Sequence, residues 1–219
     1  MKLLALDTST ELCSAALLCA GEWHVREEMA GNRHSELLLP MIDSLLAETG
    51  LALADLDGLA YGKGPGSFTG LRIGCGVAQG LAFGADLRVV GIGTLQAMAQ
   101  AAGAERVLTC IDARMHEIYA AAYRRQDGGW IEAMAPAVLK PADLDLPDGE
   151  DWFGCGTGFA AYPDLLAGRL SGVRADVYPR AEAVARLALV EFEAGRGMPP
   201  DAVEPFYVRD KVALKTCER

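Results

Sequence analysis

The sequence predicts an α/β protein whose two halves repeat one pattern of elements. Short apolar segments typical of strands alternate with segments of helical periodicity along most of the chain. One apolar segment ends at Asp7 and another at Asp112, and each is followed by polar residues and a second apolar segment. We interpret this as a degenerate internal duplication, with one domain over residues 1–103 and a second over 104–219.

The first half reads as three strands, followed by three helices that alternate with two further strands. Polar residues 8–11 and Gly21 separate the first strands, and Gly50 ends the first helix. Thr94 is expected to cap the third helix. The expected strands are 3–6, 13–19, 23–29, 56–61 and 87–92, and the expected helices are 34–49, 69–85 and 94–102.

The second half gives weaker signals. Glycines at 154–158 precede a helix expected from about Phe159, and a turn explains them better than a nucleotide-binding loop. Pro179 and Gly195 are placed as expected for the first turn and the end of another helix. Residues 207–219 receive no assignment. The expected strands are 107–111 and 118–123, with shorter ones at 130–131, 137–139 and 152–155.

Composition limits the classes of function. The 219 residues suffice for one large domain or for two of about 110 residues. Because 51% of the residues are hydrophobic, a full core is expected rather than disorder. The net charge of −10 argues against direct binding to a phosphate backbone, so any role with nucleic acid is expected to be indirect.

The cysteines and the N-terminus indicate a cytoplasmic protein. The six cysteines show no C-x-x-C spacing and mostly lie in apolar segments, which is typical of reduced core residues. Four apolar residues between Lys2 and Asp7 are too few for a signal peptide, and no run approaches the roughly 18 apolar residues of a membrane span. We therefore expect no membrane association.

The most unusual stretch is GKGPGSFTGLRIGCGVAQGLAFG, residues 62–84. Its glycines and Pro65 predict a sharp turn, after which Ser67 or Thr69 caps a helix. A turn that leads into a helix N-terminus makes an anion site plausible.

This second helix carries an unusual number of glycines, at 70, 74, 76, 80 and 84. Each interior glycine costs roughly 0.5–1 kcal/mol relative to alanine, so close packing must offset the cost. At 100° per residue one face carries Gly70, Gly74, Val77, Ala78 and Leu81. The helix either packs closely onto the protein's own sheet or also accepts a helix from this or another chain, and we prefer the second alternative.

The first helix also has more apolar surface than one core needs. Leu38, Leu39, Ile42, Leu45 and Leu46 form the expected core face, and two more apolar residues widen it to roughly 200°. We therefore predict a helix-to-helix partner interface. Its predicted residues are Leu37, Met41, Ser44, Leu45, Gly70, Gly74, Val77, Ala78 and Leu81.

A nucleotide site is a weaker hypothesis, with Asp7, Thr8 and Asp112 as its candidates. An acidic residue followed by hydroxyls at a strand-to-strand turn can hold a phosphate or hydrated Mg²⁺, although from these residues alone an ordinary hairpin turn is the preferred interpretation. His34 has Leu38 one helical turn later, so we expect a cap or surface histidine and no metal site. No catalytic residue is predicted.

Four segments resemble the bacterial TsaB (YeaZ) family in order and spacing: LLALDTST, RHSELLLPMIDSLL, GKGPGSFTGLRIGCGVAQGLA and VVGIGTLQAMA. IDARMHEIYAAAY and FYVRD add weaker similarity in the second half. The resemblance implies two actin-like (ASKHA, ribonuclease H-like) lobes. It also implies a role in forming N6-threonylcarbamoyladenosine next to the tRNA anticodon, as a non-catalytic partner of the related TsaD protein, with TsaE supplying ATPase action.

The resemblance further implies that the first two helices pair with TsaD, and that the chain dimerises through the same surface when alone. It leaves ATP or ADP as a candidate ligand at the interface of the complex, and tRNA as an indirect partner. The sequence departs from the catalytic relatives, which carry H-x-x-x-H where this chain has His34 and Leu38. Arg114, Met115 and His116 stand where the family fold usually has small residues near phosphate.

An enzyme is the alternative to an interaction protein. Such an enzyme would be a small ATPase or a small-molecule kinase that uses Asp7 and Asp112 with Mg²⁺. A peptidase is least expected, because Ser67 has no identifiable His and Asp partners in the sequence and a helix cap explains it better.

Overall fold

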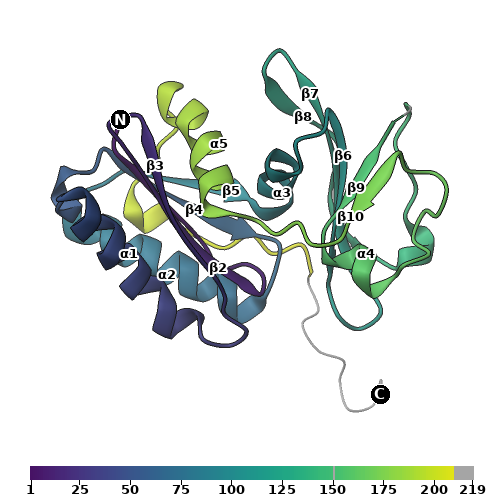
Figure 1. Cartoon of the computed structure of the whole chain (residues 1–219), viewed down its shortest axis with the longest axis horizontal. Coiled ribbons are helices and arrows are strands. Elements are labelled where there is room, and N and C mark those ends of the chain that lie inside the picture. Colours follow the sequence, from purple (N-terminus) through teal and green to yellow (C-terminus); the bar gives the residue numbers. More distant parts are fainter. Residues whose placement is uncertain (150, 210–219) are drawn as a thin grey trace.

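Two five-stranded sheets form the centres of two lobes in the computed structural model, which describes residues 1–149 and 151–209 (Figure 1). The N-terminal sheet has the order β3-β2-β1-β4-β5, and the C-terminal sheet has the order β8-β7-β6-β9-β10 when read in the same direction. In each sheet the first three strands in chain order pair antiparallel and the last two add in parallel. The two lobes therefore share one topology, which agrees with the expected α/β fold of two similar halves.

The N-terminal sheet consists of β1 (Leu3–Asp7), β2 (Leu12–Cys19), β3 (Glu22–Met29), β4 (Gly58–Gly64) and β5 (Val89–Gly93). Its helices are α1 (His34–Thr49), α2 (Phe68–Ala85) and α3 (Thr94–Ala102). Gly50 ends α1 with a φ of 67°, and Ser67 Oγ accepts a hydrogen bond from the Gly70 N–H at the start of α2. The expected elements of the first half, and the Ser67 alternative for the cap, are thus confirmed. The expected cap of α3 was wrong, because Gly93 occupies the N-cap position and the buried Thr94 Oγ1 makes no hydrogen bond to the start of the helix.

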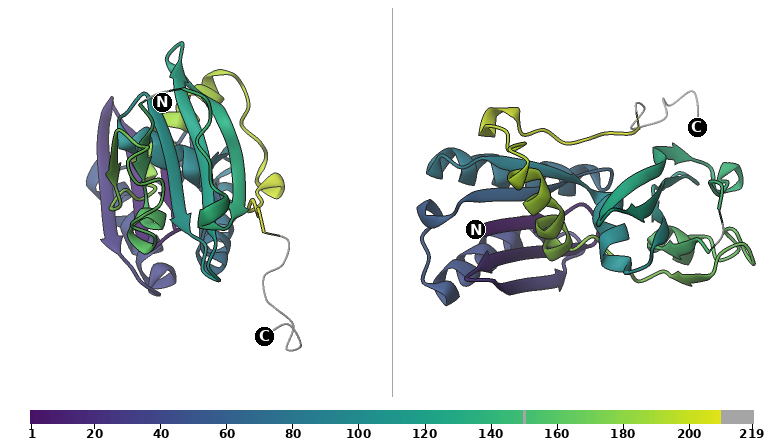
Figure 2. Two further views of the ribbon diagram at one scale, coloured as in Figure 1. Left: turned by 90° about the vertical axis from the view of Figure 1, so that its right-hand side faces the viewer. Right: turned by 90° about the horizontal axis from the view of Figure 1, so that it is seen from above.

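Residues 3–6 of β1 are all apolar because both faces of the strand are covered. Leu4 and Leu6 pack with residues of α1 and α2, whereas Leu3 and Ala5 pack with residues of α5 (Ala181–Glu193) and with Ala97 of α3. A strand that is buried on both faces has no polar position in its period-two pattern. The α1–α2 pair and α5 therefore lie on opposite faces of the N-terminal sheet (Figure 2).

The C-terminal sheet consists of β6 (Arg106–Asp112), β7 (Ile118–Gln126), β8 (Gly129–Leu139), β9 (Phe153–Cys155) and β10 (Gly172–Arg174). The residues expected as two short strands at 130–131 and 137–139 belong to one long strand, β8. The short strand β10 was not predicted, and α4 (Thr157–Ala161) begins before Phe159. These local signals were weak because β9, α4 and β10 have three to five residues each.

After the second sheet the chain returns to the first lobe. The helix α5 packs on β1, β2, β4 and β5, and Met198 pairs with Val89 of β5. Residues 181–203 thus lie with the N-terminal lobe in space, although the predicted second domain, 104–219, assigns them to the other one. Figure 1 shows α3 between the two sheets, and its residues contribute to the cores of both lobes.

Among the helices that the structure describes, none combines the length and the apolar character that crossing a membrane requires.

Candidate interaction face and interlobe cavity

The inner face of α2 packs closely against the turn after β1. A Cβ atom at Gly70 would lie 2.0 Å from the Thr8 carbonyl oxygen, and one at Gly74 would lie 2.5 Å from Thr8 Oγ1. Ala78 is also fully buried. These small residues let the helix approach its own sheet, which offsets the cost of glycine in a helix.

This packing corrects part of the predicted interface. Gly70, Gly74 and Ala78 face the protein's own β1 and its turn, so for them the alternative of packing on the sheet is right. Leu45 of α1 is fully buried as well. A partner cannot contact these three residues of α2 or Leu45, because residues of the same chain already cover them.

The outer face of α2 carries a second set of glycines. Cβ atoms at Gly76, Gly80 and Gly84 would meet no atom within 4 Å. Val77 and Leu81 lie between them along the helix, Ile73 lies one turn before Gly76, and all three are half-buried. The signal was present in the sequence, since the five glycines fall into two sets with i, i+4 spacing whose mean directions lie about 100° apart around the helix. The predicted interface contains Gly70 and Gly74 of the buried set and none of the open glycines.

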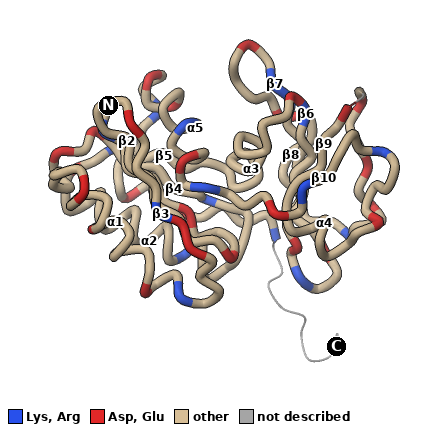
Figure 3. Tube along the Cα trace, in the orientation of Figure 1, with Lys and Arg blue, Asp and Glu red and all other residues tan. Residues whose placement is uncertain are grey.

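The face is also nearly free of charge. Arg72 is the only charged residue in the 18 residues of α2, and the tube of α2 in Figure 3 is accordingly almost uniform. Phe83 is 71% exposed, and Leu39 on the neighbouring α1 is 45% exposed although it was expected in the core. An exposed apolar patch of this kind is typical of an interaction surface.

The other predicted residues of α1 are not fully buried, and one of them contacts β3. Ser44 Oγ accepts a 3.3 Å hydrogen bond from Arg26 Nε of β3 and is exposed, while Leu37 and Met41 are half-buried. We call the outer surfaces of the two helices the helix-pair face. It comprises Leu37, Leu39, Met41, Ser44, Ile73, Gly76, Val77, Gly80, Leu81, Phe83 and Gly84.

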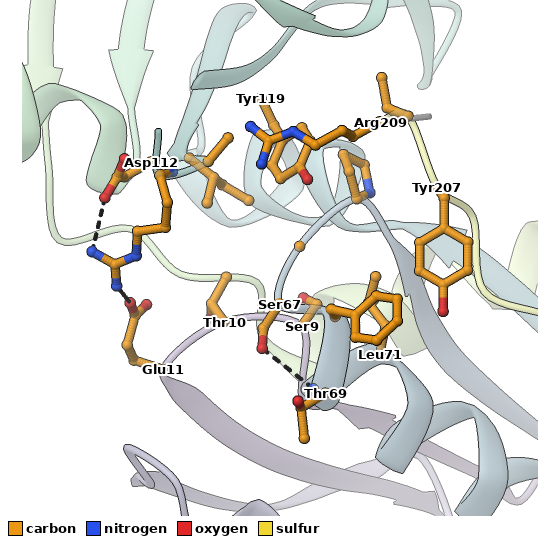
Figure 4. A pocket seen from close by; sticks show the side chains of 18 of the residues that line it. Ser9, Thr10, Glu11, Ser67, Thr69, Leu71, Asp112, Tyr119, Tyr207 and Arg209 are labelled. Carbon is orange, nitrogen blue, oxygen red and sulfur yellow. Dashed lines mark hydrogen bonds and ion pairs between the residues drawn. The ribbon is translucent and has the colours of Figure 1, made fainter. Parts of the chain in front are cut away.

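A cavity of about 720 Å³ lies between the lobes (Figure 4). Its wall in the N-terminal lobe is formed by the β1–β2 turn and by the start of α2, residues 66–71. Its wall in the C-terminal lobe is formed by the β6–β7 turn, and residues 206–209 complete it. Asp112 lines this cavity, but Asp7 and Thr8 do not.

Asp7 and Thr8 are held inside the N-terminal lobe. Asp7 Oδ1 accepts hydrogen bonds from Ser9 N at 2.9 Å and from Ser9 Oγ at 2.7 Å, while Oδ2 is buried without a partner. Burial raises the pKa of Asp7 to about 7, against the lowering effect of the Ser9 hydrogen bonds. The structure therefore separates the three predicted nucleotide residues and leaves only Asp112 at the cavity.

The charged groups around the cavity neutralise one another. Arg114 Nη1 lies 3.0 Å from Asp112 Oδ2, and Arg114 Nη2 lies 3.6 Å from Glu11 Oε1. Arg209 Nη2 lies 2.5 Å from Glu117 Oε2. Each cation here is already paired, so a bound phosphate would have to compete with these carboxylates.

His34 has a structural role that the sequence did not reveal. Its side chain is buried, and its Nε2 lies 2.8 Å from the Thr10 carbonyl oxygen, so it joins α1 to the β1–β2 turn. The expectation of a cap or surface histidine was wrong, because the contact lies 24 residues away in sequence. Within residues 1–149 and 151–209, no cluster of three or more His, Cys, Asp or Glu could hold a metal ion.

Comparison with known proteins agrees with this architecture. The model of the family "TsaD: tRNA N6-adenosine threonylcarbamoyltransferase" matches residues 25–194. The "tRNA threonylcarbamoyladenosine biosynthesis protein TsaB" of Escherichia coli K12 is 44% identical, with 98% of this chain and 97% of that protein covered. The protein of the same name from Haemophilus influenzae is also 44% identical, with 98% and 96% covered.

Solved structures give the same result. The structure "YeaZ from Pseudomonas aeruginosa" superimposes with a TM-score of 0.90 at 43% identity, covering 94% of this chain and 99% of that one. A second Pseudomonas aeruginosa structure, described as similar to peptidase YEAZ, also gives a TM-score of 0.90, at 42% identity with 95% and 99% covered. The chain therefore belongs to the TsaB (YeaZ) family, within the broader family of actin-like folds that the TsaD model describes.

Proposed function

We propose that this chain acts in tRNA threonylcarbamoyladenosine biosynthesis as a non-catalytic partner of a TsaD-type transferase, which it binds through the helix-pair face. The names of its relatives give the pathway. The observation that supports the binding mode is the outer face of α2, where three glycines are open and the residues between them are only half-buried.

The open glycines favour a helix as the occupant of this face. Without side chains at Gly76, Gly80 and Gly84, another helix can approach the α2 backbone closely and gain dispersion contacts over three turns. Exposed glycines in a helix are otherwise a cost of roughly 0.5–1 kcal/mol each with no packing to offset it. A partner that covers them supplies that packing.

The same face can join two copies of the chain. A two-fold axis through it would place each α2 against its counterpart, in an isologous dimer. We propose that the chain forms this dimer when alone and exchanges it for the TsaD homologue. In this proposal TsaE joins the resulting complex, ATP or ADP binds at its interface, and tRNA contacts this chain only indirectly.

The interlobe cavity supports a non-catalytic role. Asp7, the expected magnesium ligand of an ATPase or kinase, is buried away from the cavity and bonded to Ser9. Arg114 and Arg209 are both paired with carboxylates of this chain. The competing hypothesis, an ATPase or small-molecule kinase that uses Asp7 and Asp112, is tested by ATP turnover of the purified chain. Robust turnover that is lost in Asp7→Asn would replace our proposal.

The direct test is to mix the chain with the TsaD homologue of its own organism and to measure mass by light scattering. We expect a homodimer that converts to a heterodimer. Gly80→Leu should abolish both species, because a leucine side chain occupies the space of the partner helix, while circular dichroism stays unchanged. A heterodimer that forms normally with Gly80→Leu would show that the partner binds elsewhere.

A further inference from the structure

The last described residues begin on the N-terminal lobe. Val203 is part of the core beneath α1 and α2, and the Tyr61 hydroxyl donates a 2.8 Å hydrogen bond to the Glu204 carbonyl oxygen. The Phe206 N–H donates a 2.6 Å hydrogen bond to the Lys63 carbonyl oxygen. Residues 203–206 are thereby fixed along β4.

The chain then crosses the start of α2. The Tyr207 ring lies 5.7 Å from the Phe68 ring, centre to centre, and its hydroxyl accepts a 3.1 Å hydrogen bond from Arg72 Nε. A Cβ atom at Gly64 would lie 2.4 Å from the Phe206 carbonyl oxygen, so Gly64 lets this segment lie directly against the turn before α2.

Arg209 makes its contacts in the other lobe. Besides the ion pair with Glu117, its guanidinium carbon lies 5.7 Å from the centre of the Tyr119 ring, and its Nη1 lies 3.7 Å from Met115 Sδ. The Arg209 side chain is only 14% exposed and that of Glu117 is 33% exposed. The other ion pair across the cavity, Arg114 with Glu11, is 76% and 45% exposed and contributes little because water screens it.

The crossing segment borders the space between the lobes. Figure 4 shows Tyr207 and Arg209 on one side of the 720 Å³ cavity, with Glu11 and Asp112 on the other. Phe206 also lines a second cavity of about 840 Å³, which lies between α5 and the β7–β8 hairpin. Phe206 thus lines both cavities, and the segment touches both lobes.

We propose that residues 203–209 form a latch between the lobes, anchored on β4 and α2 and closed on the C-terminal lobe by Arg209. Breaking the Arg209–Glu117 pair releases the latch and opens the interlobe cavity, without unfolding either lobe. The proposal is independent of the helix-pair face, whose residues lie on the outer side of α1 and α2.

Hydrogen–deuterium exchange of the full chain tests the latch with Arg209→Ala. We expect exchange to rise about three- to tenfold, as for the loss of one partly buried ion pair, in peptides covering 66–71 and 113–117. Arg169→Ala is the matched control, because it removes an ion pair with Asp145 that lies within the C-terminal lobe. It should leave both peptides unchanged. The double variant Arg209→Glu with Glu117→Arg should restore slow exchange.

Two results would overturn the latch. Unchanged exchange at 66–71 and 113–117 in Arg209→Ala would show that the pair does not hold the lobes together. If exchange also rises in β9 and β10, Arg209 stabilises the whole C-terminal lobe rather than holding that lobe against the N-terminal lobe. Thermal unfolding of the variant, followed by circular dichroism, distinguishes the second result from local opening.

Discussion

The Thr8 hydroxyl donates a 2.7 Å hydrogen bond to the Gly70 carbonyl oxygen and so joins the end of β1 to the first turn of α2. This contact is possible because Gly70 and Gly74 carry no side chain on the face that meets Thr8. At Gly76, Gly80 and Gly84 of the same helix, an added Cβ atom would have no atom within 4 Å. Substitutions at the two sets should therefore have opposite effects on stability.

Gly70→Ala should destabilise the fold. The added methyl group would lie 2.0 Å from the Thr8 carbonyl oxygen, a backbone atom that cannot move without shifting the β1–β2 turn. Overpacking of this kind typically costs about 1–3 kcal/mol and outweighs the gain in helix propensity. Urea denaturation measures the change in the free energy of unfolding.

Gly80→Ala is the matched substitution on the outer face. No atom lies within 4 Å of the new methyl group, so only helix propensity should count. We expect a gain of about 0.5–1 kcal/mol in the free energy of unfolding of the monomer. Destabilisation by Gly80→Ala similar to that of Gly70→Ala would contradict the assignment of the two faces.

The association of the chain should depend on Phe83 and not on exposed apolar residues outside the helix-pair face. Phe83→Asp places a charge on the helix-pair face, where it would be desolvated by a partner helix. Val190→Asp is the control, because Val190 is 59% exposed but lies on α5. Analytical ultracentrifugation should show a loss of affinity of at least about tenfold for Phe83→Asp, which corresponds to about 1.4 kcal/mol, and little change for Val190→Asp. Equal losses in both variants would point to a general effect of charge.

Asp7 should make the chain less stable as the pH rises. Burial raises its pKa from 3.8 to about 7 in the folded state, so between these values the folded chain binds the proton and the unfolded chain does not. Unfolding therefore releases a proton, and the free energy of unfolding falls with pH by up to about 1.4 kcal/mol per unit across this window.

Asp7→Asn isolates this contribution. Its amide oxygen can still accept the hydrogen bonds of Ser9, but the side chain does not ionise. The difference in unfolding free energy between variant and parent, measured in urea from pH 5 to pH 8, should move in favour of the variant as the pH rises. A constant difference would mean that Asp7 has an ordinary pKa in the folded chain.

Ser67→Ala should weaken the start of α2. Ser67 Oγ accepts the hydrogen bond of the Gly70 N–H at 3.3 Å, and loss of such a cap costs about 1 kcal/mol. Thr69→Ala is the control, since Thr69 is exposed in the first turn and does not cap the helix. Thr69→Ala should change the thermal midpoint no more than an ordinary surface substitution, and Ser67→Ala should lower it more. If Thr69→Ala lowered the midpoint more than Ser67→Ala, Thr69 would be the cap.

The sequence alone determined the elements that depend on local chemistry. Gly50 and Ser67 set the end of α1 and the start of α2, and the apolar segments that end at Asp7 and Asp112 indicated two similar halves. These features rest on backbone conformation and on residues a few positions apart, so a single sequence contains them.

Tertiary structure decided which side of each element meets which neighbour. The periodicity of α2 gave two glycine stripes, but only the position of Thr8 shows that Gly70 and Gly74 face inwards and that Gly76 and Gly80 remain open. Likewise, the return of α5 to the first lobe and the burial of Asp7 away from Asp112 follow from contacts between distant segments. Such contacts are set by how the sheets and helices pack together, and no local pattern of residues encodes them.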